Sequence, residues 1–237
     1  MAQDILSADA PAAPRHADDP LGAARPWWRR PWIVLLWALV ALTLLYIWQH
    51  YIGFDPSKAT VRLPKAHPWK YPVLIVHIVG GSIALIAGAL QLWPWLRRTR
   101  PALHRTIGRI YLFGGVLPTV VAATLLFTIL GGGPGTIGRI TLGVLWTITS
   151  TLAFVKIRQR QYAEHRKYMI FSYALALDAF SVRFLIWAGI PLIGKENLDF
   201  ELFFEFVAWC GWLFNLLVAY WWVERTSKPR RRAVRTG

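Results

Sequence analysis

The sequence predicts an all-α membrane protein whose helices cross a bilayer six times. Two observations carry this prediction: 55% of the 237 residues are hydrophobic and only 16% are charged, and the apolar residues gather in long runs. A run of about 20 apolar residues spans the roughly 30 Å hydrocarbon core as an α-helix. A soluble domain of this length would not contain such runs. The predicted spans are residues 32–52, 72–95, 106–130, 138–156, 168–193 and 202–223.

The connections between these runs alternate in composition, which supports the count of six. The segment 53–71 holds three prolines, and 131–135 reads Gly-Gly-Gly-Pro-Gly, which favours a tight turn between antiparallel spans. The second-to-third and fourth-to-fifth connections are instead basic. Trp residues gather near span ends, where amphipathic rings favour the membrane interface. They are Trp27, Trp28, Trp32, Trp93, Trp95, Trp221 and Trp222.

The distribution of charge predicts the orientation of the bundle. The net charge is +15, and twenty of the 27 Lys and Arg residues fall in segments that six spans place on one side. Lys and Arg near span ends accumulate on the cytoplasmic side, so both termini are predicted to be cytoplasmic. A basic face of this kind attracts anionic lipid headgroups. This distribution argues against nucleic-acid binding as the source of the charge.

Three regions are expected along the chain. Residues 1–27 lack apolar periodicity and predict a disordered cytoplasmic tail. Residues 28–223 form the six-helix transmembrane domain, and 224–237 form a basic cytoplasmic tail. The first apolar run begins too late and is too long for a cleavable signal peptide, so it is expected to remain as an anchor.

Three histidines are the leading candidates for a site. His104 and His165 each precede an arginine just before an apolar run, whereas His77 lies inside one. Ionisable groups are costly in hydrocarbon and usually mark a function. At about 100° per residue, each histidine shares its helix face with mainly small or polar residues, which indicates that spans two, three and five turn these faces inward. The faces contain Gly81, Ala84, Gly88, Gln91 and Trp95 with His77; Gly108, Tyr111, Gly115, Pro118 and Ala122 with His104; Met169, Ser172, Ala176, Ala179 and Arg183 with His165.

An inner polar layer is expected at the cytoplasmic ends of spans three and five. Its members are His104, Arg105, His165 and Arg166, with Gln91 and Tyr111 in register. The two histidines could ligate the iron of one haem b, with the arginines near its propionates. The other interpretation is that both His-Arg pairs lie in the headgroup zone and bind lipid phosphate. The sequence leaves both open.

An outer polar layer is expected from the depths of His77, Arg183 and Glu205. Because charges in hydrocarbon tend to pair, an ion pair between Arg183 and Glu205 is predicted, the alternative being that each reaches separately to the outer interface. Asp178 falls near mid-membrane and is expected either to relay protons or to bond hydroxyl groups of the fourth span. Those hydroxyls belong to Thr147, Thr149, Ser150 and Thr151. Asn215 is expected to form a hydrogen bond between helices.

Three ordered segments resemble one family of uncharacterised bacterial membrane proteins, DUF2306. They are the stretch from His77 to Leu92, Leu103-His104-Arg105 with Gly108-Arg109-Ile110-Tyr111, and Glu164 to Ile170. The resemblance covers about residues 70–190 and implies a multi-pass bacterial inner-membrane protein, with no agreed reaction or cofactor. The matching positions are His77, Gln91, His104, Arg105, Tyr111, His165, Arg166 and Met169.

A looser similarity connects the chain to membrane cytochromes b and to oxidase-assembly proteins. It is incomplete, because a second haem would require a facing partner for His77, and only His50 or His67 is available. The chain also lacks a phosphate-binding Gly-rich loop, a Gly-x-Ser-x-Gly elbow and a His-Glu-x-x-His zinc motif. With Cys210 as its single cysteine, it has no intrachain disulfide or Cys-based metal cluster.

Three functions remain open. The first is a haem-binding protein with a redox or assembly role, using His104 and His165. The second is a transporter of a small solute or of protons that uses the outer layer together with Asp178. The third is a non-catalytic subunit whose basic face binds lipid or a membrane-protein partner.

Overall fold

A computed structural model describes residues 31–60, 67–129, 132–194, 196 and 198–227. Within these ranges the chain forms helices joined by turns and no strand. Six helical stretches are long and apolar enough to cross a membrane, which confirms the predicted fold class. They are Pro31–Tyr51, Lys70–Leu92, Pro101–Thr128, Thr136–Arg158, Tyr162–Ile193 and Phe200–Thr226.

Two of these spans are composite. The third consists of α4 (Pro101–Arg109), the π-helical η4 (Ile110–Val116) and α5 (Leu117–Ile129). The fifth consists of α7 (Tyr162–Ala176) and α8 (Asp178–Ile193). The remaining elements are continuous helices or short connectors. They are α1 (Pro31–Tyr51), η3 (Pro56–Lys58), α2 (Lys70–Leu92), α3 (Pro94–Thr99), α6 (Thr136–Arg158) and α9 (Phe200–Ser227).

Several helices extend beyond the apolar runs. The third span begins at Pro101 and the fifth at Tyr162, so both His-Arg pairs lie inside the first turns of their helices. Pro101 suits a first helical position because its missing N–H has no helical partner there. Hydropathy identifies only the apolar part of a helix. The polar first turns of the third and fifth spans were therefore not predicted from the sequence. α9 likewise continues past Val223 to Ser227. The predicted tail 1–27 lies outside the described residues.

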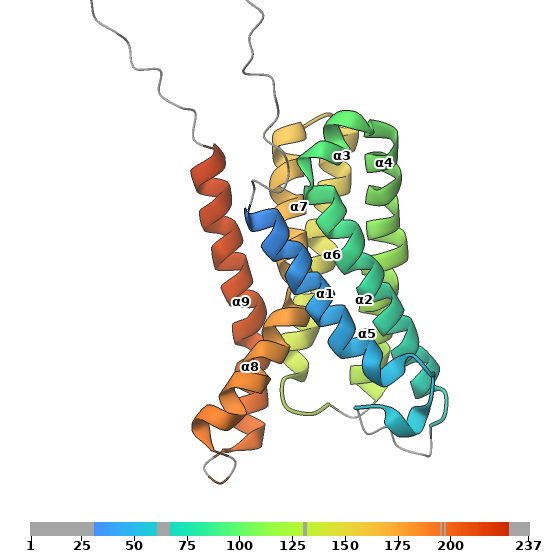
Figure 1. The fold of residues 1–237 in the computed structure, drawn as a ribbon, viewed down its shortest axis with the longest axis vertical. Helices are drawn as coiled ribbons and strands as arrows, with labels where there is room; N and C mark the ends of the chain where they lie inside the picture. Colours follow the sequence, from blue (N-terminus) through green and yellow to red (C-terminus); the bar gives the residue numbers. More distant parts are fainter. Residues whose placement is uncertain (1–30, 61–66, 130–131, 195, 197, 228–237) are drawn as a thin grey trace, which may run out of the picture.

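Spans two to five form a four-helix bundle. α2 packs along η4 and α5, and α6 packs along α7; α5 and η4 also contact α6, while α7 returns to α2. The third and fifth spans therefore face each other diagonally across the bundle. α1 lies against α2 and α8, and α9 lies against α6, α7 and α8 (Figure 1). The described chain begins and ends at the same end of the bundle, where α4 and α7 also begin (Figure 1).

Small residues allow the central helices to approach closely. The Cα and amide nitrogen of Ala84 would lie only 2.9 Å from a Cβ atom built on Gly115. The three predicted inward faces are largely confirmed by the burial of their middle residues. Buried are Ala84, Gly88, Tyr111, Gly115, Ala122, Ser172 and Ala176. Trp95 is the exception, since it belongs to the separate helix α3 and is 49% exposed.

The π-helical segment η4 precedes Pro118. Proline has no N–H, and its ring collides with the carbonyl group four residues earlier, here that of Gly114. The wider turn accommodates this: the Leu117 amide bonds the Leu112 carbonyl, five residues back. Such π segments are frequent at functional sites. This one carries Tyr111 into the middle of the bundle.

The fifth span breaks at Leu177, and Figure 1 shows α8 leaving the direction of α7. The Leu177 carbonyl accepts from the amides of both Phe180 and Ser181, a tightened turn. Asp178 lies at the start of α8, where a carboxylate is favourable because the N-terminal end of a helix is electropositive. The break thus places a charged residue inside the bundle.

We expect Gly115→Ala to lower the free energy of unfolding by about 1–3 kcal/mol, because the new methyl group would overlap the α2 backbone. Gly114→Ala is the matched control. It lies in the same segment, and its nearest neighbours would be at 3.7 and 3.8 Å, ordinary contact distances. Unfolding in mixed micelles measures both variants. Equal effects of the two substitutions would contradict this close packing.

Candidate functional site

His104 on α4 and His165 on α7 lie at the same end of the bundle, on the two spans that face each other diagonally. Both side chains are partly buried. The structure thus places the two histidines of the predicted inner layer at the same end of the bundle.

The ring of His165 is held by the neighbouring helix. Its Nδ1 lies 2.8 Å from the Ala153 carbonyl oxygen of α6. A carbonyl oxygen only accepts, so Nδ1 carries the proton and donates. This hydrogen bond orients the ring and leaves Nε2 with a free lone pair, an arrangement common in metal-ligating histidines.

The ring of His104, in contrast, is not oriented by a hydrogen bond at Nδ1. Its Nδ1 is buried and has no hydrogen-bond partner among the described residues. The backbone carbonyl of His104 accepts from Gln91 Nε2 at 2.7 Å, so Gln91 fixes α4 against α2 through the main chain. Arg97 and Arg105 lie close enough to affect the imidazole electrostatically. A buried polar nitrogen without a partner is costly and calls for an explanation.

The two arginines of the His-Arg pairs point outward. Arg105 and Arg166 are exposed. Arg166 donates a hydrogen bond to Thr226 Oγ1 on α9 at 3.3 Å. Both arginine side chains are therefore accessible to an anionic group at this end of the bundle.

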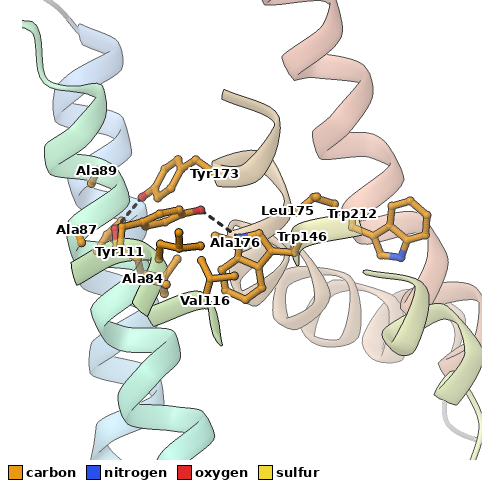
Figure 2. Close-up of a cluster of buried hydrophobic side chains, with 13 residues drawn as sticks. Ala84, Ala87, Ala89, Tyr111, Val116, Trp146, Tyr173, Leu175, Ala176 and Trp212 are labelled. Carbon is orange, nitrogen blue, oxygen red and sulfur yellow. Dashed lines mark hydrogen bonds between the residues drawn. The ribbon is translucent and has the colours of Figure 1, made fainter. Parts of the chain in front are cut away.

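A closed network of hydrogen bonds lies beneath the histidines. Tyr111 and Ser172 each follow a histidine by seven residues, about 10 Å deeper along their helices. Their hydroxyl oxygens are 2.6 Å apart, and that of Ser172 is 2.7 Å from Ser150 Oγ. The Trp146 indole N–H donates to the Tyr111 hydroxyl at 3.0 Å, as Figure 2 shows. All four residues are buried, so spans three, four and five are joined at mid-bundle.

The sequence predicted only part of this network. Tyr111 and Ser172 stood on the inward faces of the two histidines, but Trp146 and Ser150 on α6 were not linked to them. A second tyrosine, Tyr173, packs beside Gly88 and donates to the Leu85 carbonyl at 3.0 Å. The aromatic rings and this closed network form a packed layer below the histidines.

The outer layer differs from its prediction. His77 Nδ1 donates to the Thr119 carbonyl at 3.0 Å, which ties α2 to α5. The predicted ion pair between Arg183 and Glu205 is wrong: in the described part of the chain, the sole salt bridge joins Lys167 to Glu164 at 3.8 Å. Both Glu205 oxygens are engaged elsewhere. Oε2 accepts from the amide of Gly135 at 2.5 Å, and Oε1 accepts from Trp209 Nε1 at 2.9 Å.

Gly135 explains why Glu205 accepts a hydrogen bond from a main-chain amide and does not pair with Arg183. It precedes α6 with a left-handed φ of 80°, a conformation that glycine adopts without strain. A Cβ atom at this position would also collide with Ala208 and Phe204 of α9. The turn therefore sits against α9, with its amide directed at Glu205.

Arg139 also belongs to this layer, although the sequence did not predict it there. It lies in the first turn of α6 and interacts electrostatically with Asp178 and Glu205. It also acts on His77 and Arg183. Its position in the sequence could have identified it. Arg139 follows the Gly-rich turn by four residues, which places it at the same depth as Glu205.

Asp178 is 7% exposed and faces Gly211 of α9. Its Oδ1 has no hydrogen-bond partner among the described residues. The predicted bonds to hydroxyls of the fourth span are absent from the described part of the chain. Thr147 and Thr149 instead donate to carbonyls of their own helix, as hydroxyls in apolar helices often do. The prediction for Asn215 is confirmed, since its Oδ1 accepts from Ser181 Oγ at 2.9 Å.

The sequence profile of one family, described as a predicted membrane protein (DUF2306), matches residues 74–223. The chain belongs to this family. The match extends through span six, beyond the 70–190 region of the resemblance. No curated protein and no solved structure matches the chain. The family and the six spans establish a multi-pass membrane protein of a family without an assigned function.

We expect Tyr111→Phe to destabilise the protein by roughly 1–3 kcal/mol, because Trp146 Nε1 would lose its buried acceptor. Tyr220→Phe is the control, since Tyr220 is 58% exposed and should change stability by less than about 0.5 kcal/mol. Chemical unfolding followed by tryptophan fluorescence compares the two. A Tyr111→Phe variant as stable as Tyr220→Phe would show that the network is dispensable.

Proposed function

We propose that the protein binds one haem b at the inner layer, with His104 and His165 as axial ligands and an electron-transfer or assembly role. The observation that carries the proposal is the placement of two partly buried imidazoles on diagonally opposed spans at one end of a four-helix bundle. Bundles of this kind build cofactor sites from side chains on facing helices.

The donor set supports a porphyrin better than a bare metal ion. Among the residues that the structure describes, no group of three or more His, Cys, Asp or Glu is arranged to hold a metal ion. A haem iron would take most of its ligands from the porphyrin, so two histidines would be enough to hold it. The free Nε2 of His165 and the unpartnered imidazole Nδ1 of His104 are suited to that role.

The surrounding residues have separable tasks in this proposal. Ala153 and α6 hold the His165 ring in its ligand tautomer. Arg97, Arg105 and Arg166 supply positive charge for the propionates at the end of the bundle. The layer of Tyr111, Trp146 and Tyr173 closes the site from below and excludes water. When bound, the haem supplies one-electron redox chemistry, which these residues would tune by burial and charge.

The purified full-length protein, expressed with added haem precursor, is expected to show a reduced-minus-oxidised b-type spectrum. His104→Ala and His165→Ala should each abolish it, because each removes an axial ligand. His50→Ala is the matched control, as His50 lies at the opposite end of the first span and bonds only the Tyr46 carbonyl in the described structure.

Two results would overturn the haem proposal. One is a colourless protein despite ample haem. The other is a spectrum that survives both His104→Ala and His165→Ala but is lost in His77→Ala, which would move the ligand to the outer layer.

We further propose that the histidine end faces the cytoplasm of a bacterial cell, within the inner membrane, and contacts anionic lipid headgroups. The exposed basic residues gathered at this end support it. They include Arg97, Arg98, Arg100, Arg105, Arg109, Arg158, Arg160, Arg166 and Arg225.

Reporter insertions test this orientation. A green fluorescent protein fused after residue 237 should fluoresce, and alkaline phosphatase inserted at Gly133 should be active, since the first folds in the cytoplasm and the second outside it. The reversed pattern, an inactive insertion at Gly133 with an active alkaline phosphatase at the C-terminus, would contradict the proposed orientation.

A further inference from the structure

The two histidines of the inner layer are held in different ways. His165 is oriented at its ring, because Nδ1 donates to the Ala153 carbonyl of α6 at 2.8 Å. The Nδ1 of His104 is buried and has no hydrogen-bond partner among the described residues. The position of the His104 imidazole therefore depends on how firmly the main chain of α4 is held.

A glutamine of α2 holds that main chain. Gln91 Nε2 donates to the His104 carbonyl at 2.7 Å, and within the described ranges it is the only side chain of another helix that forms a hydrogen bond to α4. In an α-helix the same carbonyl also accepts from the amide four residues later, here that of Gly108. A carbonyl oxygen has two lone pairs, so both bonds can form. Gln91 thus stabilises the turn 104–108, from which the imidazole projects.

Gly108 provides the surface on which the Gln91 amide lies. A Cβ atom built on Gly108 would be 3.5 Å from both Nε2 and Oε1 of Gln91 and 3.6 Å from its Cδ. These nearly equal distances show that the face of the amide plane, and not its edge, lies over Gly108. Residues four apart share one face of a helix, so the amide lies one turn from His104 on the same face of α4. A methyl group on Gly108 would meet the amide at an ordinary contact distance, whereas a longer side chain would displace it.

We propose that Gln91 is a positioning residue for His104: it holds the His104 carbonyl against α2 and thereby sets the position of the imidazole as an axial ligand. This inference rests on the haem proposal. It gives Gln91, acting through the main chain, the role that the Ala153 carbonyl has for the ring of His165. Removal of a group that orients a ligating histidine typically weakens metal binding about 10- to 100-fold. A bond that only joined α2 to α4 would contribute to stability and leave the ligand unaffected.

Two substitutions on different helices disrupt the same contact. Gln91→Leu removes the donor and keeps a side chain of similar size, and Gly108→Leu displaces the amide without changing Gln91. Gly108→Ala is the matched comparison, because its methyl group would fit beside the amide. Gln49→Leu is the control for loss of a glutamine, since Gln49 donates only to the Tyr46 carbonyl of its own helix in the described structure.

The first measurement is the electron paramagnetic resonance spectrum of the oxidised full-length protein purified with haem. Two axial imidazoles give low-spin iron, and loss of one gives high-spin iron. The wild-type protein, Gly108→Ala and Gln49→Leu should be low-spin. Gln91→Leu and Gly108→Leu should each show a high-spin fraction and bind haem about 10- to 100-fold more weakly.

The second measurement requires no haem. Amide hydrogen exchange of the haem-free protein should be about 2- to 10-fold faster at residues 104–108 in Gln91→Leu than in the wild-type protein, because one hydrogen bond to this turn is lost. Exchange in α6 and α7 should be unchanged, which also shows that the variant is folded.

The outcomes separate this inference from the haem proposal. A colourless wild-type protein overturns both. A low-spin haem that is unchanged in Gln91→Leu and Gly108→Leu overturns the positioning role alone, even if exchange at residues 104–108 is faster, because Gln91 would then stabilise α4 without affecting the ligand. An effect of Gly108→Ala as large as that of Gly108→Leu would also contradict it, since the amide keeps its place in the alanine variant.

Discussion

The hydrogen-bond network of Tyr111, Trp146, Ser150 and Ser172 is the interaction on which the bundle most depends. A hydroxyl or indole N–H in hydrocarbon has no water to bond, so its partner has to come from another span. Here each partner lies on a different helix, and the network closes with O···O separations of 2.6 and 2.7 Å. Spans three, four and five are consequently fixed in one register, which a purely apolar interface would not impose.

That register determines what the two ends of the bundle can do. Two turns toward one end, the helices that carry Tyr111 and Ser172 also carry His104 and His165. Toward the other end, the same packing encloses Arg139, Arg183 and Asp178. The packed aromatic layer separates the two groups. The haem site that we propose at the histidine end therefore shares no side chains with the charged residues at the other end.

Much of this arrangement could be predicted from the sequence, because hydropathy and helical periodicity are local properties. The six spans, the inward faces of Tyr111 and Ser172, and the interhelical bond of Asn215 followed from spacing alone. The partner of Glu205 did not, because it is a main-chain amide presented by the left-handed Gly135. Arg139 was missed for a related reason: charge counting treats every arginine near a span end as a topology signal. No proline or glycine lies beside Leu177, so residue type did not predict the break in the fifth span.

A double-mutant cycle between Tyr111→Phe and Ser172→Ala tests the central claim most directly, because it isolates their mutual contact from the burial that each side chain contributes alone. Reversible unfolding in bicelles measures the four proteins. If the network holds the spans in register, the two substitutions couple by about 0.6–2 kcal/mol. Additivity within about 0.3 kcal/mol would mean that the hydroxyls are independent, and the network would then not organise the bundle.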